Sequence, residues 1–110
     1  MNKAKTPPGR LAGKVALITG AAGNLGSEIV RHYLRQGALV VLSGRTKARL
    51  TAAREAALKD TGVPAEQADT VVMDGADPAS VRAGIADLVA RHGRIDILVN
   101  HAGSAGPRQR

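Results

Sequence analysis

Three glycines, Gly20, Gly23 and Gly26, follow a short apolar run and precede a stretch in which apolar residues recur at helical spacing. Glycines let a backbone turn tightly and approach a bulky anion closely. The free N–H groups and the positive dipole end of the following helix would then face that anion. The spacing therefore predicts a turn that binds the pyrophosphate of a dinucleotide. The open alternative is an ordinary tight turn between a strand and a helix.

The end of the second apolar run carries residues that distinguish between the two nicotinamide dinucleotides. A site for NAD usually has an Asp or Glu about 20 residues past the glycines, to hold the ribose hydroxyls. Residues 38–53 contain no acid, and Arg45, Lys47 and Arg49 cluster there instead. A guanidinium binds a 2′-phosphate through paired charged hydrogen bonds, whereas a carboxylate would repel it. We expect NADP(H) rather than NAD, with Arg45 as the main contact and Ser43 as a hydroxyl partner. The alternative is that these cations only begin a solvated helix.

The elements that must position these residues alternate regularly along the chain. Strands are expected at the apolar runs 15–18, 39–42, 70–73 and 97–99, and the stretches between them have helical spacing. Strands without a polar face that alternate with helices indicate a parallel sheet covered on both sides. The expected fold class is therefore α/β, a Rossmann-like doubly wound parallel sheet (β-α-β-α-β-α-β) with strand order 3-2-1-4.

The ends of the second and third helices are marked by residue type. Thr46 and Asp77 are expected to cap these helices, and Pro78 suits a first helical position. Gly62 and Gly93 are expected to end them. The third helix is expected to bury one apolar face, made of Val81, Ile85, Leu88 and Val89.

Three turns that are far apart in sequence are expected to converge on one crevice. In the strand order 3-2-1-4, the switch point lies between strands one and four, and ligands bind beyond the carboxyl ends of the strands there. Gly20, Asp74 and Asn100 each follow the end of a different strand. This placement predicts a single site at that edge of the sheet.

These turns resemble the short-chain dehydrogenase/reductase family. Residues 19–26 (Thr-Gly-Ala-Ala-Gly-Asn-Leu-Gly) resemble the family's Thr-Gly-x-x-x-Gly-x-Gly, and residues 100–103 (Asn-His-Ala-Gly) resemble its Asn-Asn-Ala-Gly. Asp74 resembles the Asp that contacts the adenine. Asn24 and His101 depart from the family's pattern. The expected cofactor-binding residues are Gly20, Gly23, Asn24, Leu25, Gly26, Ser43, Arg45, Asp74, Gly75, Asn100, Ala102 and Gly103.

The resemblance also implies a catalytic Ser and a Tyr-x-x-x-Lys pair, which this sequence lacks. Tyr33 is followed four residues later by a glycine, and Ser104 comes too early for the family's Ser. His101 is expected to be a turn residue, and His32 and His92 are expected on helix surfaces. No catalytic residue is therefore expected in this chain. No cluster of carboxylates and histidines has the spacing of a metal site.

The chain thus resembles the NADP(H)-binding portion of an oxidoreductase that reduces a carbonyl by hydride transfer. A narrower resemblance, carried by residues 9–26, 73–75 and 100–109, is to the amino-terminal modules of bacterial bifunctional malonyl-CoA reductases, which implies malonate semialdehyde as the carbonyl substrate. The alternative is a non-catalytic dinucleotide-binding module or sensor that needs a partner chain. Full-length members of the resembled family are usually homo-oligomers.

Composition argues against several other classes. The 110 residues carry a net charge of +7, but they include one Tyr and no Phe or Trp, so aromatic rings that could stack nucleic-acid bases are nearly absent. There is no Cys for a disulfide, and no apolar run approaches the ~18 residues of a membrane span. We expect a flexible leader over residues 1–13, a truncated NADP-binding domain over residues 14–110, a cytoplasmic location, and no nucleic-acid or membrane partner.

Overall fold

Four parallel strands form one sheet in the order β3-β2-β1-β4, which confirms the predicted fold class. The computed structural model describes residues 9–100. The strands are β1 (Val15–Thr19), β2 (Leu39–Gly44), β3 (Ala68–Val72) and β4 (Ile97–Val99). The helices are α1 (Asn24–Arg35), α2 (Lys47–Thr61) and α3 (Pro78–His92), and the 3₁₀ helix η1 (Ala65–Gln67) leads into β3.

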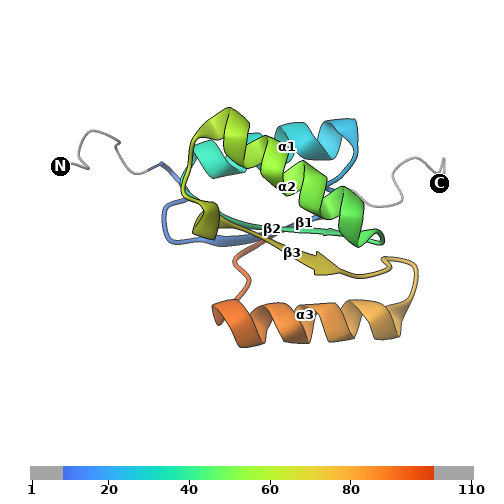
Figure 1. Cartoon of the computed structure of the whole chain (residues 1–110). Coiled ribbons are helices and arrows are strands. Elements are labelled where there is room, and N and C mark those ends of the chain that lie inside the picture. Colours follow the sequence, from blue (N-terminus) through green and yellow to red (C-terminus); the bar gives the residue numbers. More distant parts are fainter. Residues whose placement is uncertain (1–8, 101–110) are drawn as a thin grey trace.

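The sheet separates two apolar layers. Helices α1 and α2 cover one face, and α3 covers the other (Figure 1). Successive side chains of a strand point to opposite faces. Ala16 and Ile18 of β1 therefore pack in the cluster beneath α1 and α2, whereas Val15 and Leu17 pack in the cluster that faces α3.

Three of the four predicted helix ends form as expected. The Asp77 carboxylate accepts a hydrogen bond from the Ala79 backbone N–H at 3.1 Å, with Pro78 in the first turn. Gly62 and Gly93 end α2 and α3 with left-handed φ angles of 73° and 87°. Thr46 precedes α2, but its side chain makes no capping hydrogen bond, so the sequence prediction of a side-chain cap there is wrong.

The third strand and the third helix differ from the sequence prediction. Strand β3 begins at Ala68 and ends at Val72, so it starts two residues earlier than predicted. Val89 of α3 is 40% exposed instead of buried, because Leu88 occupies the contact with the sheet and Val89 lies about 100° further round the helix. His92 is half-buried and pairs with Asp69 of β3, whereas the sequence placed it on the surface.

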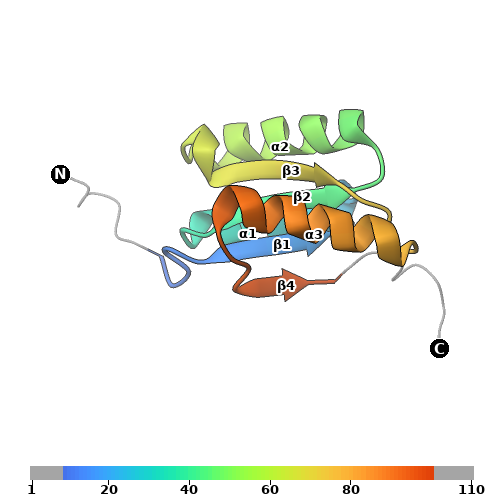
Figure 2. The same cartoon turned by 90° about the horizontal axis from the view of Figure 1, so that it is seen from below.

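Hydrogen bonds outside the strand pairing hold the segment before β1 and the start of β4. Residues 9–13, which were expected to belong to a leader, form a turn in which the Leu11 N–H donates to the Gln36 carbonyl at 2.9 Å. Strand β4, which Asp96 precedes, pairs with β1. Oδ2 of Asp96 accepts from the Val15 N–H at 2.8 Å and from Arg94 Nε at 2.8 Å. Figure 2 shows β4 at the sheet edge, beside α3 rather than beneath it.

Candidate functional site

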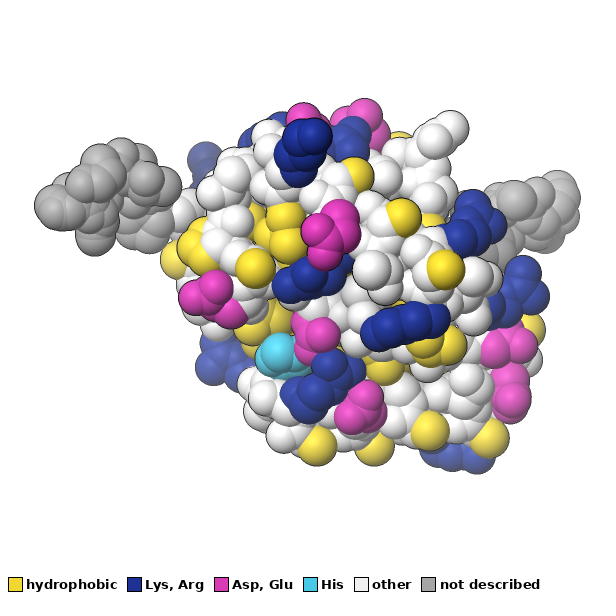
Figure 3. Space-filling view, in the orientation of Figure 1, with side chains coloured by type: hydrophobic (Ala, Val, Ile, Leu, Met, Phe, Trp, Pro, Cys, Tyr) yellow, Lys and Arg dark blue, Asp and Glu magenta, His cyan; other side chains and the backbone are white. Residues whose placement is uncertain are grey.

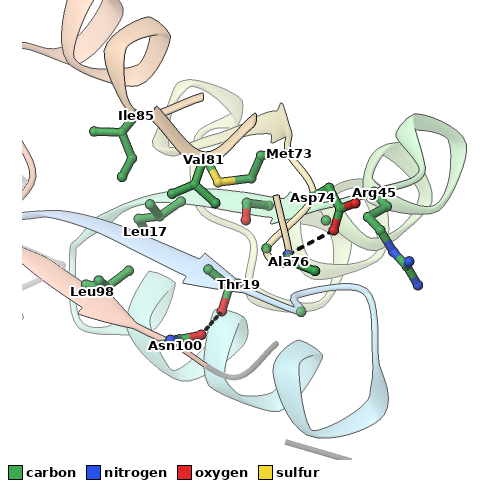
Figure 4. A pocket seen from close by; sticks show the side chains of 14 residues that line it. Leu17, Thr19, Arg45, Met73, Asp74, Ala76, Val81, Ile85, Leu98 and Asn100 are labelled. Carbon is green, nitrogen blue, oxygen red and sulfur yellow. Dashed lines mark hydrogen bonds between the residues drawn. The ribbon is translucent and has the colours of Figure 1, made fainter. Parts of the chain in front are cut away.

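A crevice of about 620 Å³ opens at the carboxyl ends of the strands. It lies where the turns after β1, β2, β3 and β4 meet, which is the predicted position (Figure 4). Its lining residues are Leu17, Thr19, Gly20, Ser43, Gly44, Arg45, Met73, Asp74, Gly75, Ala76, Val81, Ile85, Leu98 and Asn100. Parallel strands that all end at one edge of a sheet bring these distant segments together.

Half of the predicted site residues line this crevice. They are Gly20, Ser43, Arg45, Asp74, Gly75 and Asn100. Gly23, Asn24, Leu25 and Gly26 do not line it, but form the turn after Gly20 and the start of α1. Ala102 and Gly103 lie outside the described residues, as do His101 and Ser104.

The glycine turn owes its shape to close backbone contact. Gly20 has a φ of +64°, in the left-handed region that favours glycine. A Cβ atom on Gly26 would lie 2.2 Å from the Gly20 carbonyl oxygen, so only glycine fits there without a shift of the backbone. Gly23 precedes α1 and offers no side chain to cap the helix. The first N–H groups of α1 therefore have no side-chain cap from this residue, and such groups favour an anion.

Thr19 links the ends of β1 and β4. Its hydroxyl lies 3.1 Å from Oδ1 of Asn100 and 3.3 Å from the Val99 carbonyl oxygen. The link to Asn100 is visible in Figure 4. Sequence reasoning did not include Thr19 among the site residues. Its position directly before Gly20, in the same motif, was the available signal.

The turn after β3 is fixed by hydrogen bonds around Asp74. The Asp74 N–H donates to the Ser80 hydroxyl at 2.8 Å, and the Asp74 carboxylate accepts from the Ala76 N–H at 3.0 Å. The Asp77 N–H also donates to the Asp74 carbonyl at 3.0 Å. These bonds hold the Asp74 side chain against its own turn at the rim of the crevice. Sequence reasoning also missed Ser80, which contributes from the first turn of α3.

The cations that follow β2 do not act together. Arg45 lines the crevice near Asp74 (Figure 4). Lys47, by contrast, donates from Nζ to the Thr70 hydroxyl at 3.2 Å, on the face of β3 that α2 covers. Arg49 is exposed on α2 and does not line the crevice. Of the three cations, Arg45 is therefore the one placed to meet an anion in the crevice.

One wall of the crevice is apolar. Leu17 of β1, Leu98 of β4 and Met73 face it, and Val81 and Ile85 of α3 complete the wall (Figure 4). The sequence identified most of these residues only as core. Among residues 9–100, no group of three or more metal-ligating side chains is present. Within the same range, no helix is both long and apolar enough to cross a membrane.

The chain is similar to reductases throughout the part that forms this crevice. The sequence profile of short chain dehydrogenases matches residues 14–110. The NADP-bound N-domain of a bacterial malonyl-CoA reductase is 63% identical, with a TM-score of 0.86 over 93% of this chain and 19% of that chain. A variant actinorhodin polyketide ketoreductase solved with NADPH is 33% identical, with a TM-score of 0.73 over 82% of this chain and 33% of that chain. The oxidoreductase UcpA of Escherichia coli K12 is 41% identical over 86% of this chain and 34% of its own length.

This protein belongs to the short-chain dehydrogenase family. The expectation drawn from the glycine turn, Asp74 and Asn100 is thereby confirmed at the level of the family. The chain spans about a third of the length of the curated relatives it matches.

Proposed function

We propose that this chain is the NADP(H)-binding portion of a reductase that transfers a hydride to a carbonyl group. The observation that carries the proposal is the position of Arg45. It is a cation at the end of β2 that lines the crevice, where an NAD site would have a carboxylate. The NADP and NADPH bound to the related N-domain and ketoreductase support this assignment.

The residues of the crevice fit the parts of such a dinucleotide. The glycine turn and the first N–H groups of α1 would hold the pyrophosphate. Arg45, with the Ser43 hydroxyl, would hold the 2′-phosphate of the adenosine ribose. Asp74 and Gly75 would contact the adenine. Gly23, Asn24, Leu25 and Gly26 would lie along the pyrophosphate, and Asn100, Ala102 and Gly103 would lie toward the nicotinamide.

The bound NADPH would supply the hydride, and the residues of this chain would orient it. Thr19 holds Asn100 at the end of β4, so that the last strand and the first meet at the crevice floor. The apolar wall that includes Val81 and Ile85 keeps water from one side of the crevice and suits a planar ring. The proton chemistry of carbonyl reduction belongs to residues of the family that this sequence does not contain.

For the carbonyl substrate, we propose malonate semialdehyde. The support is the 63% identity to the N-domain of a bacterial malonyl-CoA reductase, together with the close agreement of the two backbones. The test is turnover of malonate semialdehyde with NADPH by an enzyme in which this chain replaces the matching segment of that N-domain. Loss of turnover in a chimera that is folded and still binds NADPH would argue against this substrate.

The cofactor assignment is tested by calorimetric titration of the chain with NADPH and with NADH. We expect NADPH to bind more tightly, because charged hydrogen bonds to a phosphate contribute about 1.5–3 kcal/mol. Arg45→Asp should therefore weaken NADPH binding by roughly tenfold or more and bring the two affinities together. Arg49→Asp makes the same charge change outside the crevice and should leave the preference for NADPH intact.

Two results would contradict this assignment. One is a folded chain that binds neither dinucleotide. The other is an Arg45→Asp variant that keeps the full preference of the wild type for NADPH. A chain that binds NADPH and gives no turnover in any chimera would instead favour the alternative of a non-catalytic dinucleotide-binding module.

A further inference from the structure

Within residues 9–100, strand β3 is an outer strand of the sheet and pairs only with β2. An edge strand normally exposes a row of N–H and C=O groups on which another strand can pair. The Met73 N–H donates to the Gly44 carbonyl of β2 at 2.9 Å, so Met73 faces β2. Backbone groups alternate in direction along a strand, and therefore Ala68, Thr70 and Val72 direct their N–H and C=O groups away from β2. These are the groups that a second strand would need.

Arginines from two helices occupy the outward carbonyl groups. Arg54 of α2 donates from Nε to the Ala68 carbonyl at 2.8 Å, and from Nη2 to the Ala65 carbonyl at 2.9 Å. Arg91 of α3 donates from Nη2 to the Thr70 carbonyl at 3.2 Å. Because α2 and α3 cover opposite faces of the sheet, the two guanidinium groups reach the edge from both sides.

The outward N–H groups are occupied as well. The Ala68 N–H donates to the Ala65 carbonyl at the end of η1. The Thr70 N–H donates to Oδ1 of Asp69 at 2.8 Å. All four outward backbone groups of Ala68 and Thr70 thus have partners within the chain. The outward groups of Val72, the last residue of β3, are not part of this arrangement.

A charged cluster fixes these contacts in place. Oδ2 of Asp69 pairs with Arg91 and lies 2.7 Å from Nε2 of His92. Arg91 also pairs with Asp87 one helical turn earlier, at 3.0 Å. Burial acts to raise the pKa of Asp69, but the hydrogen bonds from His92, the Thr70 N–H and Arg91 outweigh it and lower that pKa. Figure 3 shows positive and negative side chains side by side over the face where β3 runs between α2 and α3.

We propose that the β3 edge is closed over residues 68–70, where Arg54, Arg91, Asp69 and the Ala65 carbonyl hold the outward backbone groups and prevent a second copy of this chain from pairing. This inference does not depend on the cofactor, because none of these residues lines the crevice.

The experiment combines removal of the arginines with a probe for each edge. The chain contains no cysteine, so Val72→Cys introduces a single thiol at the β3 edge, where Val72 is 48% exposed. Leu98→Cys provides the same probe on β4.

Each probe is placed in the wild type, in Arg54→Met/Arg91→Met, and in the control Lys59→Met/Arg82→Met. The control removes two exposed cations from the same two helices. Dimers are trapped with a short bis-maleimide and quantified, and circular dichroism verifies the fold.

We expect dimers trapped through the Val72→Cys probe to rise several-fold in Arg54→Met/Arg91→Met, with no rise in the control. Dimers trapped through the Leu98→Cys probe should be unchanged. The inference is overturned if the folded double variant gives no more Val72-linked dimer than the control, or if the wild type already cross-links there as efficiently. If the double variant does not fold, the single variants Arg54→Met and Arg91→Met are judged by the same yield, and no increase in either overturns the inference.

Discussion

Gly26 packs against the backbone of Gly20, and the glycine turn depends on that contact. A Cβ atom at residue 26 would lie 2.2 Å from the Gly20 carbonyl oxygen and 3.0 Å from the α-carbon of Ala21. Both are backbone atoms, so no side-chain rotation can relieve the overlap. The glycine motif therefore allows two segments of backbone to pack closely, in addition to forming the proposed site for the pyrophosphate.

Gly26→Ala should destabilise the chain by about 1–3 kcal/mol, the usual range for overpacking. Urea denaturation measures this change. Gly23→Ala is a matched control, because the nearest atom to its added Cβ is the Gly20 oxygen at 3.7 Å, and its φ of −80° suits alanine. We expect Gly23→Ala to retain nearly wild-type stability. Equal losses in the two variants would refute the distinction between these glycines.

Asp96 fastens the amino-terminal ends of β1 and β4, the second of which has only three residues. The hydrogen bond from the Val15 N–H is the main cause that lowers the pKa of Asp96 below its usual 3.8, with Arg94 contributing. A carboxyl group whose pKa is lower in the folded state stabilises that state above pH 3.8. The contribution disappears as the pH falls through the lower, folded value.

We therefore expect the urea midpoint of the wild type to fall as the pH is lowered below about 5. Asp96→Asn should have a lower midpoint near neutral pH and a shallower fall in acid, because it lacks the group that titrates. Asp69, whose pKa is also lowered, will contribute the remaining slope. An Asp96→Asn variant with the same acid slope as the wild type would show that Asp96 contributes nothing to this dependence.

At the scale of the elements, Met73 connects α3 with the crevice, because it packs against Gly84 of α3 and also lines the crevice. A Cβ atom on Gly84 of α3 would lie 2.5 Å from Cε and 3.1 Å from Cβ of Met73, which lines the crevice. Gly84→Ala should gain about 1 kcal/mol from helix propensity and lose about 1–3 kcal/mol from overpacking. We expect a small net destabilisation, with the Met73 side chain displaced toward the crevice.

The consequence of Gly84→Ala for the crevice can be measured as NADPH affinity by calorimetry. It should fall several-fold, because the displaced Met73 narrows the cavity. The double variant Gly84→Ala/Met73→Ala removes the displaced side chain and should recover affinity. A loss of affinity that persists in the folded double variant would place the effect of Gly84 elsewhere.

The sequence was sufficient for the order of the elements and for much of the crevice. Continuous apolar runs and glycine turns are local signals, and the parallel topology follows from their alternation. The start of β3 was missed because Ala68 and Asp69 do not continue an apolar run. Asp69 can lie in the strand because Arg91 and His92, more than twenty residues later, pair with it. A local pattern contains no information about such a partner.

For the same reason, the sequence did not predict that the three cations after β2 point in different directions. In sequence, Arg45, Lys47 and Arg49 form one basic cluster that favours a phosphate group. In three dimensions Lys47 is held by Thr70 of a different strand, and only Arg45 of the three lines the crevice. The direction in which each long side chain points depends on the contacts of α2 with β3, which emerge only when the sheet is assembled.

At the scale of the whole molecule, the two edges of the sheet are treated differently. The outward groups of Ala68 and Thr70 in β3 are held by the two arginines, Asp69 and the Ala65 carbonyl, whereas β4 has Leu98 58% exposed beside α3. Exposed apolar side chains on an edge strand promote association with another strand. We therefore expect the isolated 110-residue chain to self-associate, and to do so through β4.

Leu98→Thr tests this expectation by sedimentation velocity. Threonine is β-branched and favours a strand, while most of the apolar surface of the leucine is lost. Because burial of a leucine contributes about 1.5–3 kcal/mol, the self-association constant should fall by roughly tenfold or more. Leu25→Thr is the control, since Leu25 is 59% exposed on α1 and away from either edge. If both leucine variants reduce association equally, general surface hydrophobicity is responsible. If only Leu98→Thr does so, the open edge at β4 is the surface through which the sheet associates.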